Sequence, residues 1–122
     1  MKSYTSLEQS RTLAEILPLE SADMHYIIMG NDEDPQSVVG LGEYIGLLPT
    51  IPCWSLAALF CIIPKRIKDF VILRIDIDDN DFAIWYDEIG CGANEDLPDV
   101  TMKEPVDACC AMILKLHEQK YL

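Results

Sequence analysis

The sequence predicts an α+β fold in which a small, mainly antiparallel sheet packs against about three helices that cover one of its faces. Three features lead to this expectation. Two consecutive strand-like runs form a hairpin, the C-terminal segment carries an apolar stripe at helical spacing, and an apolar run lies between two prolines. Half of the 122 residues are apolar and a quarter are charged, as in an ordinary globular protein. We therefore expect one domain, residues 1–122, with its own hydrophobic core.

The N-terminal part predicts a helix from about Ser6 to Leu17, followed by a short strand. Thr5 and Glu8 have capping-box spacing for the start of this helix, and Pro18 ends it. Met24 to Met29 contains residues that favour extended structure, and a glycine follows it.

Residues Gly30 to Pro52 are expected to form a long loop, because they contain four glycines and three prolines. Loops of this length are uncommon in small domains unless they are functional or mobile, so Gly40 to Leu48 is a candidate for covering a groove or gripping a partner. A surface insertion that only packs down onto the domain explains the same composition equally well. The apolar run Trp54 to Ile63, between Pro52 and Pro64, predicts a short helix at the centre of the core.

The clearest prediction is a β-hairpin formed by Phe70 to Ile77 and Phe82 to Asp87, with an Asp- and Asn-rich turn between them. Alternation along the first strand places its apolar odd-numbered residues on the core face. Along the second strand, Trp85 and Asp87 share one face and Tyr86 lies on the other. Both faces of this strand carry bulky side chains, so the aromatic residues are candidates for the core as well as for a binding surface.

A loop from Glu88 to Glu104 is expected to lead into a last helix that begins at Pro105. The apolar stripe of this helix predicts the face by which it packs. The stripe consists of Val106, Cys109, Cys110, Ile113 and Leu116.

The charge is strongly negative and unevenly distributed. The formal net charge is −12, and residues 76–107 carry eleven acidic residues against one base, Lys103. Such a field repels phosphate backbones, so we expect no direct nucleic-acid binding.

The cysteine pattern and the hydropathy favour a cytoplasmic protein. The five cysteines are an odd number, and Cys109 and Cys110 are adjacent, which does not fit a disulfide framework. The longest apolar run, Leu56 to Ile63, is too short to cross a bilayer, and the first residues lack the pattern of a signal peptide. Membrane association and secretion are therefore not expected.

The segment Asp76 to Asp81 resembles the start of an EF-hand calcium loop, with Asp87 at the twelfth position. The sixth position, however, is Asp81 where that loop needs glycine, and strands are expected on both sides. A solvated hairpin turn is the better interpretation. The cysteine spacing offers no zinc-ligand pattern, so no metal or cofactor is predicted.

The segment from Trp85 to Asp99 is the most distinctive part of the chain. Cys91 lies between two glycines and is a candidate nucleophile, but the carboxylates around it disfavour the thiolate, so a structural thiol in a tight turn is preferred. The carboxylates of the same segment are candidates for acid–base or metal chemistry, or simply for capping turns. The candidate binding residues are Trp54, Trp85, Tyr86, Asp87, Glu88, Cys91, Asn94 and Asp96.

Two segments carry a resemblance to a known group of proteins. Pro52-Cys-Trp-Ser-Leu-Ala-Ala-Leu and the run from Trp85-Tyr-Asp-Glu-Ile-Gly-Cys-Gly to Leu-Pro-Asp-Val100 are similar to short uncharacterised proteins of gut bacteria, which are often encoded on prophages and other mobile elements. The opening Tyr4-Thr-Ser-Leu-Glu-Gln-Ser and the Ser21-Ala-Asp-Met segment fit the same resemblance. The resemblance implies a provenance but no activity.

The function predicted from these features is that of a non-enzymatic accessory protein that binds another protein through an acidic loop and aromatic residues. Mimicry of DNA charge is a special case of this prediction. The alternative is a small metal-dependent or cysteine-dependent enzyme in which Asp87, Glu88, Cys91 and Asp96 share one pocket. The sequence does not fix the oligomeric state.

Overall fold

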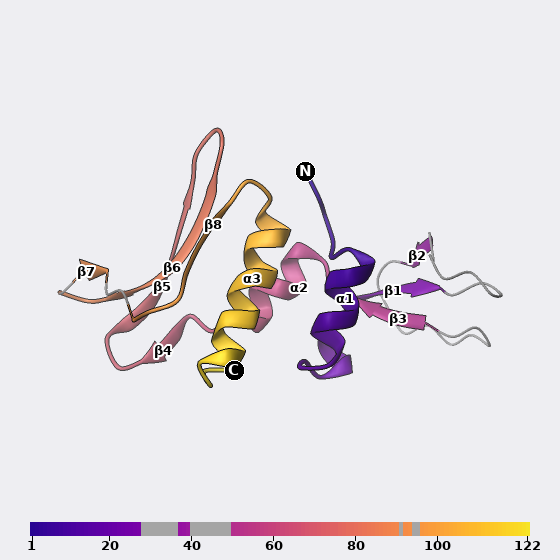
Figure 1. Ribbon diagram of the computed structural model, residues 1–122, viewed down its shortest axis with the longest axis horizontal. Coiled ribbons are helices and arrows are strands. Elements are labelled where there is room, and N and C mark those ends of the chain that lie inside the picture. Colours follow the sequence, from indigo (N-terminus) through magenta and orange to yellow (C-terminus); the bar gives the residue numbers. More distant parts are fainter. Residues whose placement is uncertain (28–36, 40–49, 91, 94–95) are drawn as a thin grey trace.

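The three described α-helices lie in the middle of the molecule, with one of the two described antiparallel sheets at each end (Figure 1). The computed structural model describes residues 1–27, 37–39, 50–90, 92–93 and 96–122. The predicted α+β class is confirmed within these residues. The strands, however, divide between two sheets, whereas the sequence predicted one.

The described elements follow one another in an order close to the predicted one. They are α1 (Leu7–Ala14), the 3₁₀ turn η1 (Leu19–Ser21), β1 (Met24–Ile27), β2 (Ser37–Val39), β3 (Thr50–Cys53), α2 (Leu56–Ile62), β4 (Arg66–Lys68), β5 (Val71–Ile77), β6 (Phe82–Glu88), β7 (Gly92–Ala93), β8 (Asp99–Met102) and α3 (Pro105–Glu118). The two segments predicted as continuous loops, 30–52 and 88–104, therefore contain short strands. The candidate groove-covering segment 40–48 lies outside the described residues.

The N-terminal sheet has the strand order β2-β1-β3. Its central strand β1 confirms the predicted strand, and Tyr26 on β1 is buried. Pro52 lies opposite His25 in β3, an edge strand, where the lack of a backbone N–H is tolerated. This placement explains how a segment rich in proline and glycine still contributes a strand.

The first helix begins one residue later than the predicted capping box. Ser6 is the N-cap: its Oγ accepts from the Gln9 N–H at 3.1 Å, and Gln9 Oε1 accepts from the Ser6 N–H at 2.9 Å. The predicted pair, Thr5 and Glu8, does not form the box, because the Thr5 hydroxyl is buried and accepts the Trp54 N–H. The correct pair has the same residue classes at the same spacing.

The C-terminal sheet has the order β4-β5-β6-β7, with β8 beside β6. The predicted hairpin is confirmed: β5 and β6 pair in antiparallel register from Val71 opposite Glu88 to Ile77 opposite Phe82. Asp78 caps the turn, since its Oδ1 accepts the N–H groups of Asn80 and Asp81 at 2.8 and 2.7 Å. These two backbone hydrogen bonds lower the pKa of Asp78. The turn is thus the solvated hairpin turn that the sequence favoured.

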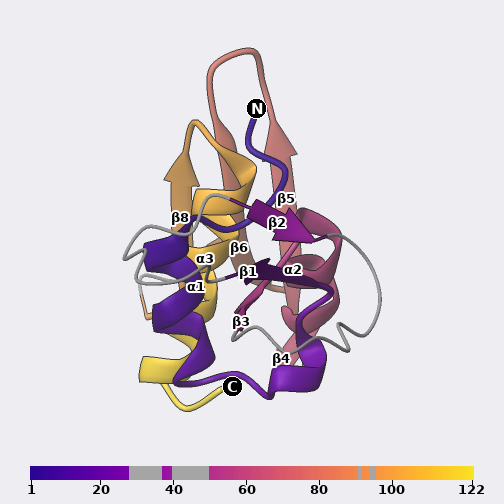
Figure 2. The ribbon, with the colours of Figure 1, turned by 90° about the vertical axis from the view of Figure 1, so that its right-hand side faces the viewer.

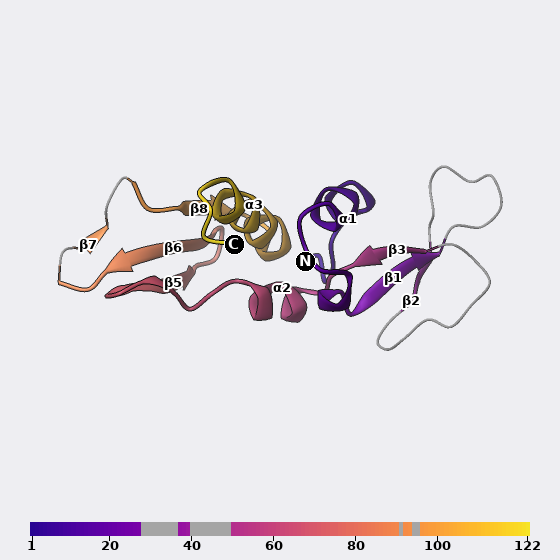
Figure 3. The same cartoon turned by 90° about the horizontal axis from the view of Figure 1, so that it is seen from below.

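The last helix, α3, packs on the face of this sheet that we call the inner face. All five residues of its predicted stripe are buried, together with Ala108 and Met112. On the sheet they meet Phe82, Ile84 and Tyr86, each no more than 2% exposed. Figures 2 and 3 show α1, α2 and α3 between the two sheets, so one hydrophobic cluster joins all three helices to the C-terminal sheet.

Two parts of the predicted core are more exposed than expected. Within α2 only Leu59 is fully buried, with Trp54 and Ile63 buried at its two ends, whereas Ala57 and Cys61 are exposed and the rest of the helix is partly buried. In the hairpin, Ile75 and Ile77 were predicted to be core residues, yet they are 42% and 70% exposed. The physical reason is that α3 packs against β6 and β8, and the end of the hairpin extends past it (Figure 1).

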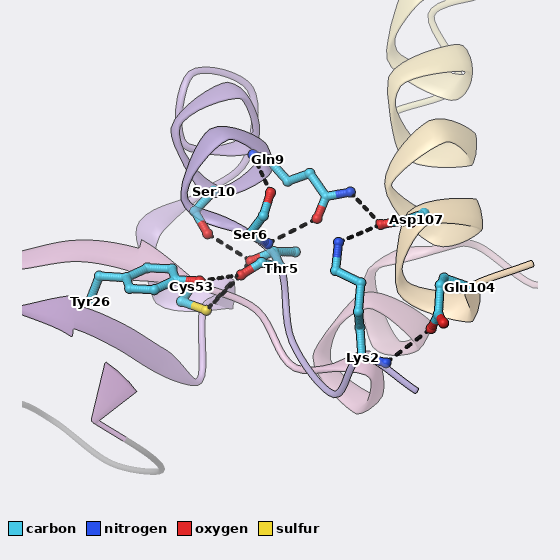
Figure 4. Close-up of polar contacts among 9 residues, drawn as sticks. All are labelled: Lys2, Thr5, Ser6, Gln9, Ser10, Tyr26, Cys53, Glu104 and Asp107. Carbon is cyan, nitrogen blue, oxygen red and sulfur yellow. Dashed lines mark hydrogen bonds and ion pairs between the residues drawn. The ribbon is translucent and has the colours of Figure 1, made fainter. Parts of the chain in front are cut away.

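Polar contacts fasten the start of the chain to the start of α3 (Figure 4). Lys2 Nζ and Gln9 Nε2 both donate to Asp107 Oδ1, at 2.8 and 2.7 Å, and the Lys2 backbone N–H donates to Glu104 at 2.9 Å. Burial acts to raise the pKa of Asp107, but the hydrogen bonds from Lys2 and Gln9 and the charge of Lys2 outweigh it and leave the pKa below its usual value. The contacts hold α1 against α3.

Replacing a buried leucine of α3 should cost far more stability than replacing an exposed one. Leu116 is fully buried, so Leu116→Ala should lower the free energy of unfolding by about 2–5 kcal/mol. Leu114, on the same helix, is 40% exposed, and Leu114→Ala should cost roughly 1 kcal/mol or less. Urea denaturation of the two variants measures both values, and equal losses would contradict the packing of α3 described here.

The depressed pKa of Asp107 predicts a pH-dependent contribution to stability. The folded chain keeps this carboxylate ionised to lower pH than the unfolded chain does, so its contribution is complete above the unfolded pKa and is lost as pH falls through the folded pKa. Asp107→Asn should therefore be less stable than the parent at pH 7, on the order of 1 kcal/mol because the Lys2–Asp107 pair is partly exposed. The two proteins should begin to converge as pH falls below about 4, the ordinary pKa of an aspartate, and should be close in stability once the folded chain protonates Asp107.

Urea denaturation at several pH values measures this convergence. Asp69→Asn, at an exposed position outside these contacts, serves as the matched control and should show little difference from the parent at any pH. A stability difference for Asp107→Asn that stays constant from pH 7 to pH 2 would contradict the linkage.

Candidate functional site

Two of the predicted binding residues, Trp54 and Tyr86, lie in the core. Trp54 is fully buried and its indole N–H donates to Ser21 Oγ at 3.0 Å. Tyr86 is 1% exposed, and its hydroxyl donates to the Pro64 carbonyl at 2.6 Å. Burial raises the pKa of Tyr86. Neither side chain is available at the surface of the folded protein, which matches the alternative that these aromatics are core residues.

Trp85 and Asp87 lie on the opposite side of β6 from Tyr86, on what we call the outer face of the C-terminal sheet. Trp85 is partly exposed in the centre of this face, between Arg74 of β5 and Asp99 of β8 in the strand register. Asp87 forms an ion pair with Arg74, with 3.6 Å between Arg74 Nε and Asp87 Oδ2. The structure therefore brings these two predicted residues together.

Glu88 and Asp96 lie in a different environment. Glu88 pairs with Val71, a buried residue of the inner side, so it projects to the opposite face from Asp87. Both carboxylates act electrostatically on Lys68, whose Nζ lies 5.4 Å from the centre of the Tyr121 ring. Interaction with Tyr121, followed by the charges of Glu88 and Asp96, raises the pKa of Lys68. The other two predicted residues, Cys91 and Asn94, lie outside the described residues.

The outer face combines an aromatic centre with charged surroundings. Its described side chains are Arg66 of β4, Ile72, Arg74 and Asp76 of β5, Ala83, Trp85 and Asp87 of β6, and Asp99 and Thr101 of β8. Figure 1 shows α3 on the inner face of the sheet and no helix on the outer one. Three carboxylates share the face with two guanidiniums, those of Arg66 and Arg74. Arg74 is paired with Asp87, and Lys115 of α3 lies 3.9 Å from Asp99 Oδ1. The face therefore has a partly exposed tryptophan at its centre and charged side chains of both signs around it, and the acidic turn of Asp78, Asp79 and Asp81 lies at its end.

The sequence predicted some of the residues of the outer face but not others. The alternation of β5 placed Arg74 and Asp76 opposite the core-facing residues of that strand, which is where they lie. The sequence indicated Asp99 only as one of the loop carboxylates and did not indicate Thr101, because β8 was predicted as loop. Its four residues carry only a weak strand signal, Val100-Thr-Met, and their pairing with β6 is distant in sequence.

A second polar cluster, which the sequence did not indicate, lies around Thr5 (Figure 4). The Thr5 hydroxyl bonds to Ser10 Oγ at 2.7 Å and to Cys53 Sγ at 3.5 Å, and it accepts the Trp54 N–H at 3.1 Å. Tyr26 donates its hydroxyl to the Thr5 carbonyl at 2.8 Å. The cluster links the N-terminal segment to β1 and β3.

The groups of this cluster are poorly suited to nucleophilic chemistry. Cys53 is fully buried, and burial raises the pKa of its thiol, so the reactive thiolate is disfavoured. Burial likewise raises the pKa of Tyr26 to about 12. The described hydrogen bonds satisfy both the hydroxyl and the carbonyl of Thr5. We interpret the cluster as a structural one.

The described residues contain no group of three or more His, Cys, Asp or Glu side chains arranged to hold a metal ion. None of the described helices has the length and apolar character needed to cross a bilayer. Comparisons with known protein families, with curated proteins and with solved structures found no match to this chain.

Removing the Thr5 hydroxyl should destabilise the protein. Thr5→Val keeps the shape of the side chain but leaves the buried Trp54 N–H and the Ser10 hydroxyl without their partner, which should cost about 1–3 kcal/mol. Thr12→Val is the matched control, because Thr12 is exposed and its hydroxyl bonds only to the Glu8 carbonyl of its own helix. Thermal or urea unfolding of both variants tests this, and equal losses would show that the buried cluster contributes little.

Proposed function

We propose that this chain is a non-enzymatic accessory protein that binds another protein through the outer face of its C-terminal sheet. The observation that supports the proposal most directly is the position of Trp85, in the centre of a sheet face that no described helix covers. Tryptophan and arginine are the residues most often responsible for binding energy at protein interfaces, and Trp85 lies beside Arg74 in the register.

The charge of the outer face indicates the kind of partner. Asp76, Asp87 and Asp99 lie on the face, within the segment that carries eleven acidic residues and one base. A basic protein surface would complement this field, which would speed association and exclude acidic partners. The same field is unfavourable to a phosphate backbone, which supports the expectation that nucleic acid is not bound directly.

The enzymatic alternative receives less support from the geometry. It requires Asp87 and Glu88 to line one pocket, whereas these neighbours in β6 project to opposite faces of the sheet. We also propose a cytoplasmic location, in keeping with the free thiols of the four described cysteines, Cys53, Cys61, Cys109 and Cys110.

The proposal is tested by incubating the tagged chain with a lysate of gut bacteria, purifying it by its tag and identifying the retained proteins by mass spectrometry. Gut bacteria are the source because the sequence resembles short proteins of these organisms. A stoichiometric partner should be retained at low salt and released as salt screens the acidic face. With the purified partner, Trp85→Thr should weaken binding by roughly 30-fold or more, as truncation of an interface tryptophan commonly does. Asp99→Asn should weaken it less and reduce its salt dependence.

Two surface changes away from the outer face serve as controls. Leu19→Thr removes an apolar side chain that is 63% exposed, and Glu118→Gln removes an exposed charge at the end of α3. Both should leave binding unchanged. Retention of the partner by Trp85→Thr at parental affinity would show that the outer face is not the interface.

A further inference from the structure

The outer edge of β5 is the backbone edge that faces away from β6, and another described strand pairs with only part of it. At its start, β4 lies beside it, with Lys68 opposite Val71 and Arg66 opposite Ile72, and the Leu73 N–H donates to the Lys65 carbonyl at 2.9 Å. From Arg74 to Ile77, no described strand pairs with this side.

The backbone groups of Ile75 and Ile77 point outward along this open stretch. In a strand, N–H and C=O groups of alternate residues point to the same side. Leu73 uses its N–H toward β4, whereas Asp78 bonds across the hairpin to Asp81, so odd-numbered residues face outward and even-numbered residues face β6. Unpaired N–H and C=O groups at a sheet edge form a template for another strand.

The side chains beside this edge are apolar on the inner side. Ile77 is 70% exposed although its neighbour across the hairpin, Phe82, is 2% exposed, and Met102 on the far side of Phe82 is 38% exposed. Ile75 is 42% exposed beside the fully buried Ile84. An apolar side chain placed next to Ile75 and Ile77 would extend the row Ile77–Phe82–Met102 and remove apolar surface from water.

On the outer face beside this edge, and in the hairpin turn beyond it, the side chains are acidic. Asp76 projects to the outer face, and Asp78, Asp79 and Asp81 follow in the turn, all of them exposed. The one base in residues 74–81 is Arg74, which is paired with Asp87. A strand added here therefore meets apolar side chains on one face and carboxylates on the other.

A second copy of this chain does not complement the edge. Antiparallel pairing of two copies within the open stretch places Ile75 opposite Ile77 and brings the two Asp76 side chains directly opposite each other, where like charges destabilise the pair. A shifted register that places Arg74 of one copy opposite Asp76 of the other also places Ile77 opposite Leu73. The Leu73 N–H, however, already donates to the Lys65 carbonyl, so a second strand cannot pair there. Charge and space both argue for a different partner.

We propose that the outer edge of β5, from Arg74 to Ile77, binds an extended segment of a protein partner as an additional strand. The segment carries apolar side chains opposite Ile75 and Ile77 and a lysine or arginine opposite Asp76, with a further base near the turn. Main-chain hydrogen bonds supply affinity in this mode of recognition, and alternate side chains supply specificity. The inference rests on the proposed function, because it names the part of the partner that is recognised.

The first experiment uses a capped synthetic peptide of alternating lysine and valine, seven residues long, and NMR of the isotope-labelled full chain. Peptide binding should shift the amide signals of Ile75 and Ile77 in a saturable way and slow their hydrogen exchange about tenfold or more. An alternating glutamate–valine peptide, and a lysine–valine peptide with a central proline, should give neither effect. A saturable response elsewhere, an equal response to the acidic peptide, or no saturable response at all would overturn the proposal.

Variants of the chain then test the edge itself. Ile75→Pro removes an N–H that points outward, so it blocks strand addition without removing a bond to β6, and the dissociation constant of the basic peptide should rise at least tenfold. Ile75→Val keeps the edge and should bind like the parent. Asp76→Lys changes an exposed side chain and should weaken binding of the basic peptide to a similar extent. This variant therefore tests the edge even if Ile75→Pro folds poorly. Unchanged affinity in Asp76→Lys would overturn the charge pattern proposed for the partner.

The two proposals fail in different ways. If Trp85→Thr abolishes binding of the purified partner and Ile75→Pro does not, strand addition is overturned and the proposed function stands. If Ile75→Pro abolishes binding and Trp85→Thr does not, strand addition stands and the assignment of the outer face is overturned.

Discussion

The packing of α3 determines which surfaces of this molecule are free to bind. Its buried residues, from Val106 to Leu116, face α1 and α2 on one side and the C-terminal sheet on the other. All the described helices lie on the inner side of that sheet (Figure 3). An antiparallel sheet is stable with one face packed and one face in water, so nothing in the fold requires the outer face to be covered. The core and the candidate interface are therefore the two sides of one strand, β6.

The register of the hairpin connects these two sides. Alternate residues of β6 supply Phe82, Ile84 and Tyr86 to the core and Trp85 with Asp87 to the outer face. A slip of one residue would exchange the two sets, burying a carboxylate and exposing the core aromatics. The turn capped by Asp78 fixes the register at one end, and the pairing of Val100 with Ile84 fixes it from the other side of β6. Strong specification of the core thus also specifies which residues form the outer face.

The sequence predicted the elements whose signals are local. The stripe of α3, the hairpin and its acidic turn follow from spacing within one segment, and all three are present. The short strands β2, β3 and β8 depend on pairing with residues far from them in the sequence, so the composition of their segments indicated loops. The strand β7 pairs locally with the end of β6, but it has only two residues. The start of α1 was ambiguous for a related reason, since Thr5–Glu8 and Ser6–Gln9 both fit a capping box, and only the burial of Thr5 decides between them. For the candidate site, alternation separated Trp85 from Tyr86, but which of them meets α3 depends on the tertiary fold.

The open edge of β5 follows from how the core is built. Tyr86 was a candidate contact residue, yet its hydroxyl is buried and donates to the Pro64 carbonyl just after α2. This contact fixes where the chain reaches the sheet, so that Lys65 arrives opposite Leu73 and β4 runs back toward Val71. β4 therefore covers the start of β5 and leads away from Ile75 and Ile77. The tyrosine that completes the inner face thus leaves the edge beside the acidic turn without a partner among the described strands. Its effect on the proposed strand-binding edge is exerted through the path of the backbone and not through its own surface.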